Sequence, residues 1–181
     1  VYFFLDMVVA HGRSLRWFTT VGNHRKDRLR KMVTNSGALI TFSDAGAHIR
    51  NMAFYNLPLR FLKLVHDSHG EGEPVMSLER AVHRLTGEQA DWLGVDAGHI
   101  RVGDRADITV LDPRGLDQDL EQVEWAEMEN FGLERMVNRV PGCVREVLIN
   151  GRPAVTDGEV VPALGREPGY GHFLRAGASG Q

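Results

Sequence analysis

The stretch Leu39-Ile40-Thr41-Phe42-Ser43-Asp44-Ala45-Gly46-Ala47-His48 decides how this sequence is interpreted. It begins within a continuous apolar run, residues 38–42, which predicts a short strand buried on both faces. The carboxylate of Asp44 follows this strand, and small residues behind it would let a ligand approach the backbone. In parallel α/β folds, binding sites gather at the carboxyl ends of the strands. Asp44 could therefore bind a metal ion or accept a proton, although an aspartate that only caps its own loop fits the same pattern.

The segments around this stretch predict an α/β fold. Residues 1–11 and 24–33 have the spacing of helices, and residues 15–21 are rich in β-branched and aromatic side chains, as strands are. With residues 38–42 they give the order helix, strand, helix, strand, which is typical of a parallel sheet covered by helices. Three more helices are predicted: residues 53–66 with a possible kink at Pro58, a helix capped by Ser77, and residues 88–93 ending at Gly94.

Beyond Gly94 the pattern changes to short strands. Asn150-Gly151 and Asp157-Gly158 are strong signals for two-residue hairpin turns. Residues 116–140 are acidic and mixed, and they receive no assignment. The predicted strands are residues 99–102, 106–111, 144–150, 153–156 and 159–161.

Composition excludes several classes of protein. The 181 residues are 43% hydrophobic and 25% charged, which is ordinary for a globular protein, and the net charge of −3 argues against a general nucleic-acid binder. A single cysteine, Cys143, excludes an internal disulfide and favours a reducing compartment, so we expect a cytoplasmic protein. The apolar segment at the start, residues 1–10, is too short to span a bilayer. Because no basic region precedes it, we do not expect a signal peptide. This abrupt apolar start predicts that the chain is part of something longer.

The ordered set of motifs resembles the metal-dependent amidohydrolases, especially the N-acyl-D-amino acid deacylase branch. In that family a strand-end Ser-Asp-x-Gly motif supplies the catalytic aspartate, and Ser43-Asp44-Ala45-Gly46 has this form. The resemblance covers most of residues 38–161 in the same order. The other matching segments are residues 77–82, 85–86, 93–94, 98–112, 147–151 and 157–159.

The resemblance implies a TIM-like (β/α)8 barrel joined to a small β-sandwich. Residues 1–94 would hold the last strand–helix units of the barrel, with residues 15–21 as its seventh strand and residues 38–42 as its eighth. Residues 95–165 would form the C-terminal part of the sandwich, and residues 166–181 a flexible tail. The chain would thus be the C-terminal portion of a larger enzyme.

The resemblance also implies the chemistry, hydrolysis of a linear amide C–N bond, most simply of an N-acyl-D-amino acid. Asp44 would bind zinc and take a proton from the zinc-bound water, whose pKa the metal lowers to about 7, and then pass it to the leaving amine. The family takes its other metal ligands from earlier strands, including a His-x-His pair that this sequence lacks. Because zinc normally needs three or four protein ligands, this chain alone is predicted to hold no zinc and to be inactive.

Three further residues are predicted to bind the substrate: Arg50, His48 and Asn23. Arg50 could pair with a substrate carboxylate through two donors, and His48 lies on the same loop. Asn23 follows the predicted seventh strand. The alternative for Arg50 is a solvated loop residue, and the alternative for His48 is a hydrogen bond within the loop. His66 and His69, with Asp67 between them, could bind a metal, but histidines near an exposed Gly-rich loop are usually only solvated.

Two other functions stay open at this point. Within the same superfamily, a cyclic amidase of the dihydroorotase or hydantoinase type is the nearest alternative. In a different class, the chain could be a non-catalytic fragment that associates with itself through the exposed barrel edge, residues 1–9 and 15–21. We expect a small-molecule N-acyl amino acid as substrate and neither a nucleic acid nor a membrane as partner.

Overall fold

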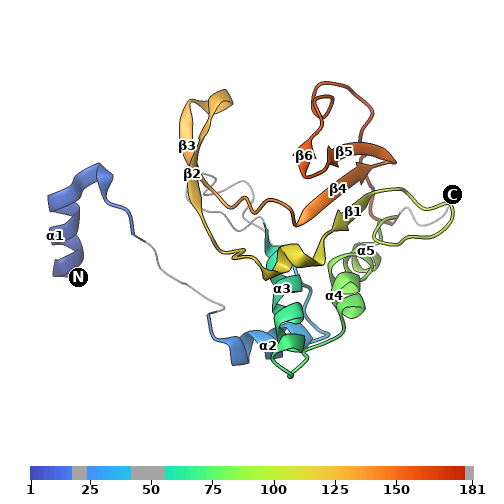
Figure 1. Cartoon of the computed structure of the whole chain (residues 1–181), viewed down its shortest axis with the longest axis horizontal. Coiled ribbons are helices and arrows are strands. Elements are labelled where there is room, and N and C mark those ends of the chain that lie inside the picture. The colour runs from blue at the N-terminus through green and yellow to red at the C-terminus, as the bar shows by residue number, and fades with distance from the viewer. Residues whose placement is uncertain (18–23, 42–55, 178–181) are drawn as a thin grey trace. The chain divides into compact units, whose positions relative to one another are not determined.

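The computed structural model describes residues 1–17, 24–41 and 56–177 (Figure 1). The chain forms two compact units, Val1–Asn35 and Ser36–Gln181, and each is described by itself. In these described ranges no helix combines the length and the apolar character that crossing a membrane requires.

The first unit contains the helices α1 (Tyr2–His11), η1 (Gly12–Ser14) and α2 (Lys26–Thr34). The helices predicted for residues 1–11 and 24–33 are therefore confirmed, apart from small shifts at their ends. Helix α1 is apolar, yet none of its ten residues is buried. Its side chains remain open to solvent, as Tyr2 at 83% and Val9 at 86% exposure show.

The strand predicted for residues 15–21 lies largely outside the described residues, and residues 15–17 are not in a strand. Residues 38–41 of the strand predicted for 38–42 are also not in a strand. A β-strand is defined by its hydrogen bonds to a neighbouring strand. Within the described ranges no strand pairs with residues 38–41. The parallel sheet, the barrel and the sandwich therefore stay predictions, as do the predicted boundaries of the three parts.

The helices of the second unit are α3 (Leu57–Gly70), α4 (Leu78–Leu85) and α5 (Gly87–Leu93). Helix α3 begins at Leu57, so the kink expected at Pro58 is wrong. Proline is in the first turn, where its missing N–H is not needed. The cap predicted at Ser77 is confirmed, because its Oγ accepts a hydrogen bond from the Arg80 N–H at 3.2 Å.

A four-stranded antiparallel sheet follows, in the order β1-β4-β5-β6. Its strands are β1 (Ile108–Leu111), β4 (Val144–Ile149), β5 (Arg152–Thr156) and β6 (Glu159–Val160). Both predicted hairpin turns are confirmed. Asn150 and Gly151 have φ of 52° and 76°, and Asp157 and Gly158 have φ of 50° and 82°, as a type I′ turn requires.

The strand predicted at residues 99–102 is wrong, because residues 99–101 have no regular structure, residue 102 is in a turn, and none of them pairs with a described strand. Ile100 and Val102 are almost fully exposed there. Their β-branched side chains favour a strand only where a neighbouring strand covers them.

A separate two-stranded hairpin lies within residues 116–140, for which the sequence predicts no element. It pairs β2 (Glu124–Met128) with β3 (Leu133–Val137) through the short η3 helix (Glu129–Phe131). Gly132, at φ 57°, closes the connection. The alternation of apolar and polar residues that identifies a strand is not visible here. Charged residues occur on both strands, and the buried residues are confined to the end of β3.

The core of the second unit is built mainly from α3, from the loops around the sheet and from the sheet itself. Helix α3 contributes a stripe at helical spacing. The buried apolar residues of this unit are Phe61, Leu62, Val65, Ala81, Ala90, Leu116, Leu120, Met136, Val137, Cys143 and Ala154.

The short η2 helix (Pro113–Asp117) packs directly against Cys143. A Cβ at Gly115 would lie 2.4 Å from the Cys143 Cα and 2.6 Å from its Cβ. No side chain fits in this space, so glycine is required here although its φ is ordinary. Cys143 is fully buried, and burial raises the pKa of its thiol.

We expect Gly115→Ala to lower the free energy of unfolding by about 1–3 kcal/mol, because the added methyl must push the Cys143 backbone away. Urea unfolding of the 181-residue chain would measure the loss. Gly70→Ala is the matched control, since a Cβ at Gly70 meets nothing within 4 Å. Equal stability of the two variants would contradict the close packing of η2.

Asp112 caps η2 and binds Arg114. Its Oδ1 accepts from the Arg114 N–H at 3.0 Å, and its Oδ2 lies 2.7 Å from Arg114 Nη2. The hydrogen bonds from the Arg114 guanidinium, and next the bond from its backbone N–H, lower the pKa of Asp112 from 3.8 to about 2. The ionised carboxylate is therefore favoured in the folded chain.

This lowered pKa predicts a pH-dependent stability. Since the folded pKa of about 2 lies below the ordinary value of 3.8, the contribution is complete above pH 3.8 and is lost as the pH falls toward 2. The Asp112→Asn variant keeps a cap acceptor but loses this contribution. In urea unfolding, the stability gap between the wild type and Asp112→Asn should narrow from pH 6 to pH 2. A constant gap would contradict the prediction.

Candidate active site

The four residues predicted for the site, Asp44, His48, Arg50 and Asn23, lie outside the residues that the structure describes. Their roles stay predictions. The structure does describe residues 38–41, which lead along the chain to Asp44. Ala38, Leu39 and Ile40 are half-buried.

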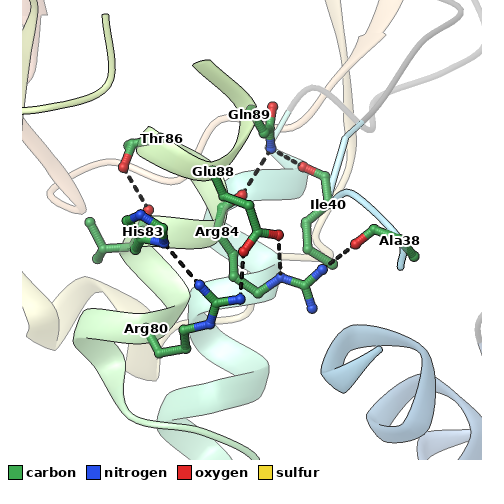
Figure 2. Close-up of polar contacts among 9 residues, drawn as sticks. Ala38, Ile40, Arg80, His83, Arg84, Thr86, Glu88 and Gln89 are labelled. Carbon is green, nitrogen blue, oxygen red and sulfur yellow. Dashed lines mark hydrogen bonds and ion pairs between the residues drawn. The ribbon is translucent and has the colours of Figure 1, made fainter. Parts of the chain in front are cut away.

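Two side chains from neighbouring helices hold this segment by its backbone (Figure 2). The Nη2 of Arg84, in α4, donates to the carbonyl oxygen of Ala38. The Nε2 of Gln89, in α5, donates to the carbonyl oxygen of Ile40. Side chains of α4 and α5 thus satisfy two carbonyl groups close to the predicted catalytic loop.

Arg84 is a buried cation, with only 1% of its side chain exposed. Its Nε donates to Glu88 Oε1 at 3.1 Å, and the other oxygen of Glu88 lies 2.5 Å from Arg80 Nη2. The Gln89 Nε2 also donates to the Arg84 carbonyl at 3.2 Å. A buried charge is tolerated when it is paired and hydrogen-bonded, and Glu88 supplies the opposite charge.

Sequence reasoning missed Arg84 and Gln89. Arg84 and Glu88 are four residues apart, which suggests an ordinary surface pair on a helix. Arg84 stands next to the apolar residues of a predicted helix, and this position could have indicated that its side chain is buried. Their acceptors, however, lie 46 and 49 residues away in the sequence.

The described histidines do not form a metal site. His99 Nε2 lies 2.9 Å from Asp91 Oδ1, and this hydrogen bond lowers the pKa of Asp91. His69 Nε2 is 2.8 Å from the Met76 carbonyl oxygen, and His66 Nδ1 is 3.8 Å from Asp117. Across the described ranges, no three His, Cys, Asp or Glu residues are placed to hold a metal ion. These residues alone therefore do not fit zinc, and the predicted ligand Asp44 lies outside them.

Comparison with known proteins identifies the class of the chain. Residues 32–155 match the model of a family described as the amidohydrolase family. This match spans well over half of the chain, so the chain belongs to the amidohydrolase family. The resemblance to amidohydrolases is confirmed at this level, and the family is one of hydrolases.

Individual relatives extend the similarity to almost the whole chain. Uncharacterized proteins of Mycobacterium tuberculosis (strain H37Rv) and of Mycobacterium bovis are each 44% identical over 183 residues. The alignment covers 98% of this chain and 30% of each relative, so the chain spans about a third of their length. No solved structure matches the chain.

Proposed function

We propose that this chain is the C-terminal portion of a zinc-dependent amidohydrolase that cleaves a linear amide, an N-acyl-D-amino acid, to a carboxylic acid and a D-amino acid. The observation that carries the proposal is the family match over residues 32–155. This range contains the Ser43-Asp44-Ala45-Gly46 motif. The 30% coverage of the relatives agrees with a chain that is part of a larger enzyme.

In this proposal Asp44 is the catalytic acid–base residue. Its carboxylate would accept a proton from the water that attacks the amide carbonyl, and would deliver it to the leaving nitrogen. A C–O bond forms and the C–N bond breaks, so the products are the acid and the free amine. Arg50 would bind the substrate carboxylate through two donors, with His48 and Asn23 beside the substrate.

The described residues supply no ligand set for zinc, so the ion would need ligands beyond them. We therefore propose no step through the metal from this chain. Elemental analysis of the purified 181-residue chain should find little or no zinc. A tightly held zinc ion would mean that the chain, or a dimer of it, completes the site, and His24, His48, His66 and His69 would then be its first candidates.

The test of the function is a substrate panel given to the complete protein that carries these residues. N-acetyl-D-amino acids, their L-enantiomers, dihydroorotate and a hydantoin are incubated with the zinc-loaded protein, and free amine and ring opening are measured. Amine release from the D-series supports the proposal. Ring opening alone would favour the cyclic amidase, and no hydrolysis at full zinc occupancy would overturn the enzymatic assignment.

One observation favours the non-catalytic alternative. Helix α1 leaves Tyr2, Phe3 and Val9 each more than three-quarters exposed. Apolar side chains exposed in such a group commonly mark a surface that another chain covers. Association of the 181-residue chain with itself, seen as a concentration-dependent mass in sedimentation, would support this alternative for the isolated chain.

A further inference from the structure

We propose that Arg84 and Gln89 are positioning residues for the catalytic loop. They hold residues 38–40 by two backbone carbonyls and so fix the point from which the chain continues to Asp44. The inference rests on the proposed function only in that it takes Asp44 to be the catalytic residue. Arg84, Glu88 and Gln89 are called the clamp below.

Residues 38–40 are held at two points. One hydrogen bond to a segment leaves it free to pivot about that bond. The clamp makes two bonds, to carbonyl oxygens two residues apart, and its donors come from two different helices. Both the position and the direction of the segment are thereby restrained. Figure 2 shows Arg84 and Gln89 reaching Ala38 and Ile40.

Both donors of the clamp are themselves held in place. The Arg84 side chain is 1% exposed, and its Nε is fixed by Glu88 Oε1 at 3.1 Å. Gln89 binds the Arg84 carbonyl at 3.2 Å in addition to Ile40, so the two donors are linked to each other. Neither donor can swing away without breaking another contact, and a displaced Arg84 would leave a buried charge without its partner.

The clamp uses a buried charge where an apolar side chain could have stood. An apolar residue of similar volume often stabilises a buried position as well as an ion pair does. Arginine offers in addition a planar group that donates to a carboxylate and a carbonyl at once. Arg84 uses both directions, one toward Glu88 and one toward Ala38. The guanidinium of Arg84 thus binds the backbone of residues 38–40 as well as Glu88.

The clamped segment is close to Asp44 along the chain. Asp44 follows Ile40 by four residues, which even in extended form span at most about 14 Å. A general base must lie within hydrogen-bond reach of its proton, and a misplacement of about 1 Å can cost ~10²-fold in rate. Loosening the segment at Ile40 should therefore reduce the rate of the chemical step more than substrate binding.

The test compares Gln89→Met with wild type in the complete zinc-loaded enzyme. Methionine has a similar length but no donor for the Ile40 carbonyl. We expect kcat to fall by roughly 10- to 100-fold and KM to rise less, because Asp44 follows Ile40 by four residues whereas Arg50, proposed to bind the substrate carboxylate, follows it by ten. Hydrogen exchange of the amides of residues 39–44 should accelerate, while the amides of β4 and β5 stay unchanged.

Two further variants separate positioning from general stability. Arg80→Met is the matched control: Arg80 binds Glu88 Oε2 but neither carbonyl, so kcat and exchange at residues 39–44 should stay at the wild-type level. Arg84→Lys keeps the positive charge but loses the planar guanidinium with its several donors. Its kcat and its exchange rate at residues 39–44 should lie between those of the wild type and of Gln89→Met. If Arg80→Met and Gln89→Met lose kcat equally, the proposal is overturned.

The link to Asp44 is tested by the double variant. In an Asp44→Asn background, Gln89→Met should cause no further loss of kcat, because the residue being positioned no longer acts. Fully additive losses would overturn the link. If the wild-type enzyme hydrolyses no N-acyl amino acid, the proposed function fails. Hydrogen exchange alone then tests whether the clamp holds residues 38–40. Faster exchange at residues 39–44 in Gln89→Met then supports the clamp, and unchanged exchange overturns it.

Discussion

Replacing Glu88 by glutamine should lower the free energy of unfolding of the second unit by about 3 kcal/mol. The Arg84 side chain is 1% exposed, and Glu88 is the carboxylate that balances its charge at 3.1 Å. Glutamine keeps the size and one acceptor but removes the negative charge, so the guanidinium would stay buried without compensation. The expected loss of stability is at the lower end of the range for broken buried ion pairs, because 18% of the Glu88 side chain is exposed. Urea unfolding followed by circular dichroism measures it.

The matched control for this variant is Glu121→Gln. Glu121 also pairs with an arginine, Arg60, at 2.6 Å, but 72% of its side chain is exposed. Water screens such a pair, so the same chemical change there should cost less than about 1 kcal/mol. If Glu88→Gln costs no more than Glu121→Gln, then backbone carbonyls alone satisfy Arg84, and the pairing argument fails.

If the proposed function is correct, Asp44→Asn should lower kcat of the complete enzyme by about 10²- to 10⁴-fold, the usual contribution of a general acid–base residue. Asparagine has the same shape but cannot take up a proton from the attacking water. Steady-state hydrolysis of the preferred N-acyl-D-amino acid measures the effect, with zinc content determined on the same samples so that metal loss is recognised.

Asp117→Asn is the control for this second prediction. It makes the same change on an aspartate whose side chain is 67% exposed and whose ion-pair partner, His66, is 3.8 Å away. Its kcat should equal that of the wild type. Full activity of Asp44→Asn would place the acid–base residue elsewhere and would remove the main role assigned to this chain.

Local signals in the sequence predicted local structure well. Ser77 was identified as a helix cap because its hydroxyl can accept a backbone N–H three residues on, and it does. Asn150-Gly151 and Asp157-Gly158 predicted two hairpin turns because both positions must adopt positive φ. Such features depend on a few consecutive residues, so no knowledge of the rest of the chain is needed.

Features whose partners the local sequence pattern does not reveal were predicted less well. Residues 99–102 have the composition of a strand but no neighbour, while β2 and β3 pair although their charged residues obscure the pattern. The candidate site shows the same limit. The role of Asp44 came from a family motif, whereas the contacts of Arg84 and Gln89 join residues more than 40 positions apart. Hydrophobic periodicity carries no information about such contacts.

The packing of Gly115 over Cys143 has a practical consequence. The chain has a single thiol, it is fully buried, and its raised pKa keeps it protonated. Only a thiolate that reaches solvent reacts with an alkylating reagent. Modification of the folded chain therefore requires a local opening that exposes Cys143. The labelling rate in excess reagent measures how often such openings occur. Cys143 can thus serve as an internal reporter of local breathing in this part of the chain, without any introduced label.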